Sequence, residues 1–207
     1  MFYIGPYPVY VFDSTPELAE KTLQAVKELE FRPAPVSKEQ NKPLRVGMVN
    51  ENGIRKAYYE SELYDWFYQC LQEVESKHLK NCKLKIVDIW AVQCKFGEMG
   101  YLHKHINSMW SGVYHLTDCK RSEVTLYHDD QFYKDWEFLL DDNLQKNNIV
   151  HNVVPKKGRL HIWPSTVPHM VKPHTLQEPR YSLAFNTFFE MDESYETKKI
   201  KLKFDLP

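Results

Sequence analysis

The sequence predicts a mainly β domain of the α+β class, a β-sandwich or small barrel with helices bracing one sheet. The chain has 207 residues, which suits one domain with a substantial core and is short for two. Two amphipathic patterns lie in its N-terminal part, and short runs of β-branched and aromatic residues follow them. We therefore expect a single domain over residues 1–207, with helical support in 1–83 and the β core in 84–192.

The N-terminal part is expected to form one edge strand and two helices. Residues 2–12 are rich in aromatic and β-branched side chains around two prolines, which favour an edge because proline cannot donate to an inner ladder. Cap-type residues at 14–17 begin a helix that ends before Pro33, and a short strand is expected at 44–49. A second helix covers 61 to about 80, with acidic residues at its start and basic residues at its end.

The remaining chain is expected to form at least seven strands, because short runs rich in Val, Ile, Tyr, Phe, Trp and Thr alternate with turn residues. These runs cover residues 84–96, 109–116, 123–128, 149–154, 159–163, 169–171 and 180–189.

Composition excludes several classes of protein. The 27 Lys and Arg residues balance 28 Asp and Glu, which argues against an overall electrostatic grip on nucleic acid. No apolar stretch approaches the roughly 18 residues of a membrane span, and the first residues do not resemble a secretory signal. The four cysteines form no C-x-x-C pair, so reduced thiols are expected rather than a thiolate zinc site. We expect a cytoplasmic protein that makes no contact with a membrane.

Histidines carry the strongest functional signal. His103 and His105 are two positions apart, so in an extended segment both rings point to one face and can reach one metal ion. H-x-H alone is weak evidence, because it occurs by chance in many proteins. His169, which follows two prolines on a short predicted strand, is the candidate for a third ligand. Taken alone, His169 is also compatible with a core histidine.

A possible carboxylate clamp follows eleven residues after His169. Arg180 offers a permanent charge on a planar fork, and Ser182 presents a hydroxyl on the same face of the strand. A metal ion and this clamp on neighbouring strands would hold a short dicarboxylic acid by both ends.

Three segments of the C-terminal half resemble the 2-oxoglutarate/Fe(II) oxygenases of marine bacteria and phages, which are relatives of the prolyl hydroxylases. The segments are GYLHKHINSMWSGVYHL (100–116), GRLHIWPSTVPHMVKP (158–173) and RYSLAFN (180–186), in the order of that family. The resemblance implies a double-stranded β-helix, or jelly roll. It also implies that His103 and His169 bind Fe(II) and that Arg180 with Ser182 holds the far carboxylate of 2-oxoglutarate. A phage-encoded member would work in the host cytoplasm.

Position 105 departs from the wider superfamily, which has a carboxylate there that completes a 2-His-1-carboxylate triad. His105 is therefore either a third imidazole ligand or a replacement whose role passes to another group. Asp129 or Asp130, at the end of a predicted strand, could supply the carboxylate. In the remaining account, water fills the third position or the site is degenerate.

A few other polar and aromatic residues have a functional and a structural interpretation each. Tyr114 is expected to contact the cosubstrate, although aromatic residues on jelly-roll strands are commonly core. Tyr127 has the same two interpretations. Asn107 and Asn186 either form hydrogen bonds in the binding pocket or lie at the ends of turns and strands with a structural role alone. His161 and Trp163 share one face of a strand, for which packing is the simpler explanation.

The sequence thus predicts a non-haem Fe(II), 2-oxoglutarate-dependent dioxygenase that hydroxylates a small molecule or peptide, with succinate and CO2 as coproducts. Its rivals are a cupin-like three-histidine metalloenzyme without 2-oxoglutarate, and a jelly-roll binding module without catalysis. A homodimer is possible through the edge strand expected at residues 2–12.

Overall fold

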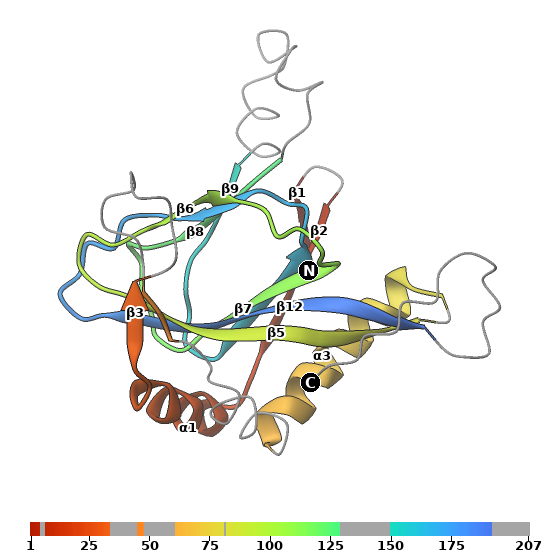
Figure 1. Ribbon diagram of the computed structural model, residues 1–207, viewed down its shortest axis with the longest axis horizontal. Helices are drawn as coiled ribbons and strands as arrows, with labels where there is room; N and C mark the ends of the chain where they lie inside the picture. Colours follow the sequence, from red (N-terminus) through yellow and green to blue (C-terminus); the bar gives the residue numbers. More distant parts are fainter. Residues whose placement is uncertain (5–6, 34–44, 48–60, 81, 129–149, 192–207) are drawn as a thin grey trace, which may run out of the picture.

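Two antiparallel sheets face each other in the computed structural model, which describes residues 1–4, 7–33, 45–47, 61–80, 82–128 and 150–191. The large sheet has eight strands in the order β1-β2-β10-β7-β12-β5-β4-β3, and the small sheet has the order β6-β11-β8-β9. Two helices lie on the outer face of the large sheet, below it in Figure 1. The predicted α+β, mainly β architecture is confirmed.

The strands of the large sheet are β1 (Phe2–Ile4), β2 (Tyr7–Asp13), β3 (Phe31–Pro33), β4 (Arg45–Gly47), β5 (Cys82–Cys94), β7 (Trp110–His115), β10 (Arg159–Pro164) and β12 (Arg180–Met191). Those of the small sheet are β6 (Gly100–His103), β8 (Val124–Tyr127), β9 (Val150–Val153) and β11 (His169–Val171). All seven strands expected in the β core are present, within a few residues at their ends. The sequence did not predict β3 and β6, which are only three and four residues long.

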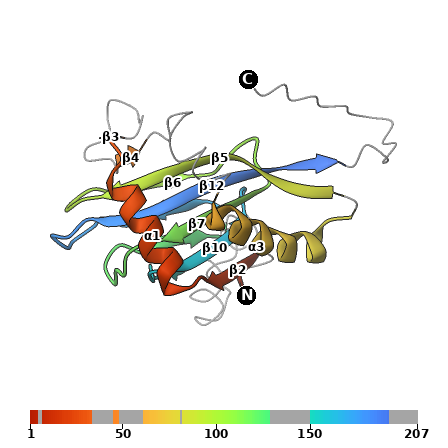
Figure 2. The same ribbon diagram turned by 90° about the horizontal axis from the view of Figure 1, so that it is seen from below.

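Both helices begin and end near their predicted limits. Helix α1 (Pro16–Lys27) is capped by Thr15, whose side chain accepts a hydrogen bond from the Leu18 amide at 3.2 Å. Helix α3 (Glu62–His78) carries acidic residues in its first turn and basic residues in its last, as the helix dipole favours. Seen from below in Figure 2, the two helices cover the same face of the large sheet.

The N-terminal segment differs from the single edge strand that the prolines predicted. It forms two strands, β1 and β2, and β2 lies inside the sheet between β1 and β10. The first half of β2 pairs only with β1, and its second half, from Tyr10 onward, pairs only with β10. Pro8 is therefore tolerated because its part of β2 has a neighbour on one side alone. The edge strand on this side of the sheet is β1, and β3 lies at the opposite edge.

The large sheet has two different faces. Its helix face packs on α1 and α3 through one apolar cluster, which includes Phe67, Leu160, Leu183 and Phe185. Gly112 serves this packing, because a Cβ there would overlap the ring of Phe185. The opposite face, called the inner face below, is turned toward the small sheet. A smaller cluster joins the two sheets there and contains Cys94, Val124, Leu126, Trp163 and Val171.

No helix in the described part of the chain is long and apolar enough to cross a membrane.

Candidate metal centre

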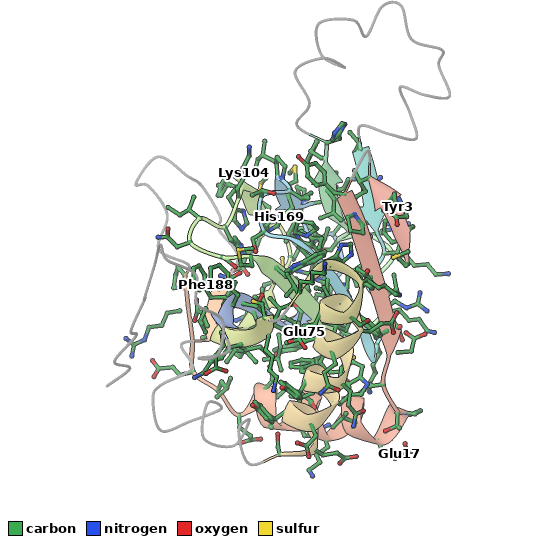
Figure 3. The ribbon with its side chains drawn as sticks, turned by 90° about the vertical axis from the view of Figure 1, so that its right-hand side faces the viewer. Tyr3, Glu17, Glu75, Lys104, His169 and Phe188 are labelled. Carbon is green, nitrogen blue, oxygen red and sulfur yellow. The ribbon has the colours of Figure 1, made fainter. Side chains whose placement is uncertain are left out.

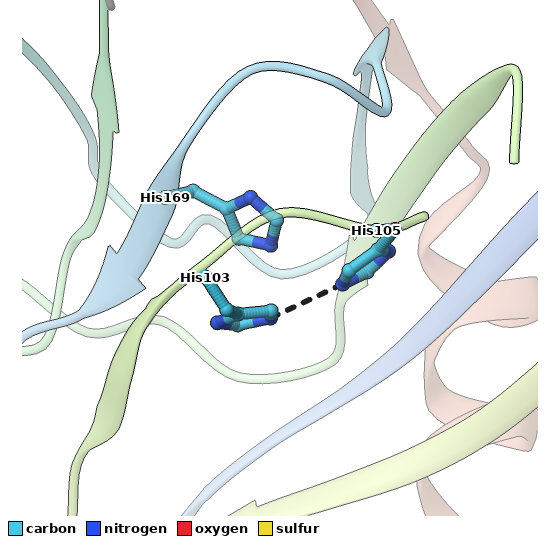
Figure 4. Close-up of side chains that lie close together, drawn as sticks. All are labelled: His103, His105 and His169. Carbon is cyan, nitrogen blue, oxygen red and sulfur yellow. Dashed lines mark hydrogen bonds between the residues drawn. The ribbon is translucent and has the colours of Figure 1, made fainter. Parts of the chain in front are cut away.

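Three histidines meet where the small sheet approaches the large one. His103 ends β6 and lies directly opposite His169, the first residue of β11, in the antiparallel pairing of the two strands. His105 follows two residues after β6, and its amide donates to the carbonyl of Ser165 at 3.1 Å. One nitrogen of each ring lies within 4.8 Å of the other two (Figure 4). The segments that the sequence singled out therefore come together in space.

Hydrogen bonds on the far side of each ring leave Nε2 of all three histidines available as a ligand. Nδ1 of His103 donates to the Tyr101 carbonyl at 2.6 Å, and Nδ1 of His169 donates to the Val167 carbonyl at 3.0 Å. Nδ1 of His105 bonds to Asn186 Oδ1, with Ser111 Oγ also 3.0 Å away. A neutral imidazole carries one N–H, so the Nε2 atoms hold lone pairs. Such partners orient metal-binding histidines generally.

The spacing of these lone pairs suits a metal ion. Nε2 of His103 and Nε2 of His105 are 3.1 Å apart, the contact dashed in Figure 4. Two nitrogens in neighbouring positions of an octahedral ion, each about 2.1 Å from the metal, are roughly 3.0 Å apart. Two lone pairs repel at this distance unless a cation lies between them. The donor set fits a divalent transition metal such as iron, for which imidazole is a suitable ligand.

Burial of the rings favours their neutral, metal-binding form. Burial, reinforced by the nearby His103, lowers the pKa of His169 to about 3. Burial also lowers the pKa of His105, against the opposing effect of its bond to Asn186. His103 is exposed, so one side of the cluster faces solvent. In Figure 3, His169 lies toward the end of the molecule remote from Glu17 of α1.

Arg180 lies on the inner face with donors that have no partner. It pairs with Cys94 across β12 and β5, and Cys94 packs against the small sheet. Its side chain is 2% exposed, and within the described residues its Nε and Nη1 make no hydrogen bond. Burial lowers the pKa of Arg180, but an arginine retains its charge in proteins. Ser182, two residues further along β12, is also buried. A buried guanidinium with unused donors fits a carboxylate.

Tyr114 lies away from these residues, on the helix face of the large sheet. Its hydroxyl hydrogen-bonds Ser14 Oγ at 2.7 Å, and its ring packs against Trp66 and Phe67. Burial raises the pKa of Tyr114 to about 12. The structure therefore places Tyr114 in the core, apart from the histidines that it was expected to accompany. Asp129 and Asp130, the alternative carboxylates, lie outside the described residues.

Several residues near the site carried no clear signal in the sequence. Asn186 and Ser111 hold His105, and Trp163 packs its ring 5.3 Å from that of His169. His161 and His115 lie on the inner face, with ring centroids 5.2 Å apart. The sequence did contain a signal for these two histidines. His161 follows the apolar Leu160 and His115 follows Tyr114, and because side chains alternate along a strand, each histidine points away from the helix face.

Comparison with known proteins agrees with this geometry. Residues 88–186 match the family model described as "Putative 2OG-Fe(II) oxygenase". These 99 residues, just under half of the chain, are similar to the 2OG-Fe(II) oxygenases that this model describes. The matched segment contains the three histidines, Arg180 and Ser182. The resemblance to 2-oxoglutarate/Fe(II) oxygenases seen in the sequence is confirmed, whereas an origin in marine bacteria or phages stays an expectation. A search of curated proteins gives no match.

Solved structures of such oxygenases share the fold. A prolyl-4-hydroxylase from Pseudomonas putida superposes with a TM-score of 0.57 at 15% identity, over 87% of this chain and 91% of that one. The 2-oxoglutarate-dependent epimerase SnoN of nogalamycin biosynthesis gives 0.64 at 9%, over 89% and 78%. HygX from Streptomyces hygroscopicus, solved with nickel, 2-oxoglutarate and hygromycin B, gives 0.57 at 9%, over 89% and 83%. The expected double-stranded β-helix is confirmed.

The family's two cofactors are Fe(II) and 2-oxoglutarate, and the residues present fit both. Three converging Nε2 lone pairs fit the metal ion. Unpartnered nitrogens of the buried Arg180 fit an anionic cosubstrate. The match over residues 88–186 is thus to a family of oxygenases, which are oxidoreductases, and three histidines that could hold a metal ion lie together within the matched segment.

Proposed function

We propose that this protein is an Fe(II)- and 2-oxoglutarate-dependent hydroxylase whose metal ligands are His103, His105 and His169. The observation that carries the proposal is the convergence of three Nε2 atoms, each with its Nδ1 engaged by an acceptor. Three neutral ligands leave the full charge of a divalent ion in the site, and this charge attracts the anionic keto-acid end of the cosubstrate. His105 thus replaces the superfamily carboxylate as a ligand.

Arg180 and Ser182 bind the other end of 2-oxoglutarate in this proposal. The guanidinium donates to the far carboxylate through Nε and Nη1, its two unpaired nitrogens, and the Ser182 hydroxyl donates from the same face of β12. Burial between the two sheets excludes water from these contacts, which strengthens them. The protein thereby fixes the orientation of the cosubstrate relative to the three histidines.

The bound iron supplies the oxidising chemistry, in which dioxygen gives one oxygen atom to a substrate C–H bond and the other to succinate, with release of CO2. Dioxygen takes up four electrons, two from the substrate and two from decarboxylation of 2-oxoglutarate. Hydroxylation is the simplest outcome, and SnoN carries the name of an epimerase on the same fold. The chain's own residues bind, orient and exclude water.

The substrate, a small molecule or peptide, approaches from the side of His103 in this proposal. His103 is exposed, and the apolar Leu102 and Ile106 beside the histidines are 60% and 85% exposed. These two side chains offer apolar contact to a substrate, while the buried His169 is shielded behind the cluster.

Succinate formation tests the function. The Fe(II)-loaded protein is incubated with 2-oxoglutarate in air, and succinate is quantified for wild type, His169→Ala, Arg180→Met and Lys104→Ala. We expect no succinate from His169→Ala, a higher KM for 2-oxoglutarate in Arg180→Met, and normal turnover in Lys104→Ala, which changes an exposed residue between two ligands. Iron binding without any succinate would instead support the cupin-like alternative, and no iron binding would support a binding module.

A further inference from the structure

Unpaired polar atoms extend beyond Arg180 on the inner face. Within the described residues, His115 makes no hydrogen bond through either ring nitrogen, although its side chain is fully buried. Nδ1 of His161, which is 4% exposed, also has no partner. Buried polar side-chain atoms in native proteins almost always have a partner, so each exception points to a water, an ion or a ligand. The apolar clusters of the fold do not explain these two histidines.

These atoms belong to one cluster with the clamp residues. His115 of β7 lies opposite Ser182 of β12, so the two side chains are cross-strand neighbours on the inner face. The ring of His161 lies edge-on to that of His115. The charge of Arg180 helps to lower the pKa of His115, which places the guanidinium within electrostatic reach of this ring. Polar atoms without a partner among the described residues therefore lie close together on three neighbouring strands of the inner face.

The charge of the cluster matches a carboxylate. Burial lowers the pKa of His115 well below its usual range and that of His161 to about 3, so both rings are neutral. Arg159, the other cation beside His115 in the pairing, is engaged by Asp13 through two bonds of 2.8 Å. Of the two described arginines that act on His115, Arg180 is then the one left for a ligand. One positive charge with neutral N–H donors complements a monoanion.

We propose that His115 is a further cosubstrate-binding residue, which donates a hydrogen bond to the far carboxylate of 2-oxoglutarate beside Arg180 and Ser182. This inference rests on the proposed function and extends it to a residue outside the H-x-H, distal histidine and R-x-S motifs. Among the described residues His115 has no hydrogen-bond partner, and the carboxylate of 2-oxoglutarate would supply one. Its neutral ring donates without adding a second charge to the buried site.

Binding measurements test this role without turnover. The Ni(II)-loaded protein is titrated by calorimetry with 2-oxoglutarate and with 2-oxopentanoate, which has a methyl group in place of the far carboxylate. His115→Leu removes the donor, whereas His115→Gln keeps an N–H. We expect His115→Leu to weaken 2-oxoglutarate binding about tenfold and His115→Gln to bind it nearly as wild type does. Affinity for 2-oxopentanoate should be the same in all three proteins.

Two results would overturn the inference: unchanged 2-oxoglutarate affinity in His115→Leu, or equal weakening of both ligands. Either result leaves the proposed function intact as long as wild type binds 2-oxoglutarate and Arg180→Met binds it more weakly. Failure of the wild-type Ni(II) protein to bind 2-oxoglutarate would overturn the proposed function itself and the inference with it.

Thermal unfolding of the ligand-free variants separates a binding role from a structural one. His174 is a matched control, since it is equally buried but bonds to Cys119 Sγ at 3.7 Å and to the Glu178 carbonyl at 2.7 Å. We expect His174→Leu to lower the unfolding midpoint, because it leaves polar partners unpaired. His115→Leu should keep or raise the midpoint, because it removes unpaired nitrogens. A similar fall in both variants would contradict the proposal.

Discussion

The two faces of the large sheet are built by the same strands but differ in chemistry. Along β10, Leu160 and Ile162 point to the helix face, whereas His161 and Trp163 point to the inner face. Along β12, apolar residues of the helix face alternate in the same way with Arg180, Ser182 and Asn186. The helix face is closed by packing, whereas the inner face keeps buried polar atoms that have no partner among the described residues. The alternation of the strand thus assigns stability to one face and ligand binding to the other.

The difference has an energetic basis. Each buried polar group without a partner destabilises a protein by about 1–3 kcal/mol, so a fold keeps such groups only where something offsets the cost. Packing of α1 and α3 against the helix face supplies apolar burial that offsets it. Sites that violate the ordinary rules of burial are commonly functional sites. The inner face fits that description.

The largest effect is expected from the helix face. Phe67 is fully buried and packs its ring on Tyr114 and Phe185. Phe67→Ala should lower the free energy of unfolding by about 4 kcal/mol, as large-to-small core substitutions do. Urea denaturation measures this loss, and metal binding by the folded fraction should be unchanged. If Phe67→Ala weakens metal binding and leaves the free energy of unfolding unchanged, the helix face contributes to metal binding and not to stability, which contradicts the roles that we assign to the two faces.

Acidification should destabilise the inner face. The pKa of His161 is about 3 in the folded protein, below its value of about 6.5 in the unfolded chain, so the unfolded state binds more protons between these values. The contribution of the neutral His161 ring to the free energy of unfolding is fully present above pH 6.5. This contribution is lost as the pH falls from 6.5 toward 3. Between pH 7 and pH 5, wild type should lose about 2 kcal/mol more than His161→Leu, by urea denaturation at each pH. If the free energies of unfolding of wild type and His161→Leu change in parallel with pH, His161 has a hydrogen-bond partner that keeps its pKa near the ordinary value.

Removing the support of a proposed ligand should have a moderate effect on metal binding. Asn186→Leu deletes the Oδ1 that accepts from His105, whereas Asn186→Asp retains an acceptor. We expect Ni(II) affinity to fall about tenfold in Asn186→Leu, with Ser111 as the remaining partner, and to hold in Asn186→Asp. Equal affinities of Asn186→Leu and wild type, measured by calorimetry, would remove His105 from the ligand set.

The smallest effect is expected from Tyr114→Phe, which deletes the hydroxyl that bonds to Ser14. The free energy of unfolding should fall by about 1 kcal/mol. Affinity for 2-oxoglutarate should not change, because Tyr114 lies on the helix face. A loss of cosubstrate affinity would restore the role that the sequence suggested for this residue.

The sequence predicted the long periodic elements from local patterns, and it predicted the metal cluster from the order of the motifs and the resemblance to the oxygenase family. Two helices, the core strands and the meeting of His103, His105 and His169 follow from spacing and motif order. The face of Tyr114 was missed because the sequence predicted its strand without predicting which side of the sheet the helices cover. The role that we propose for His115 could not be predicted, because Ser182, which lies opposite it on the neighbouring strand, is 67 residues away in the sequence (182 − 115 = 67).

In the proposed function, the three histidines and Arg180 together bind iron and 2-oxoglutarate. The most direct measurement adds Fe(II) and then 2-oxoglutarate to metal-free protein without oxygen and records the visible metal-to-ligand charge-transfer band. We predict a band in wild type that disappears in His169→Ala and is strongly weakened in His105→Ala. In Arg180→Met it should require more 2-oxoglutarate. A wild-type protein that binds iron without this band would show that 2-oxoglutarate does not bind to the iron. A band of full strength in His105→Ala would show that His105 is not a metal ligand.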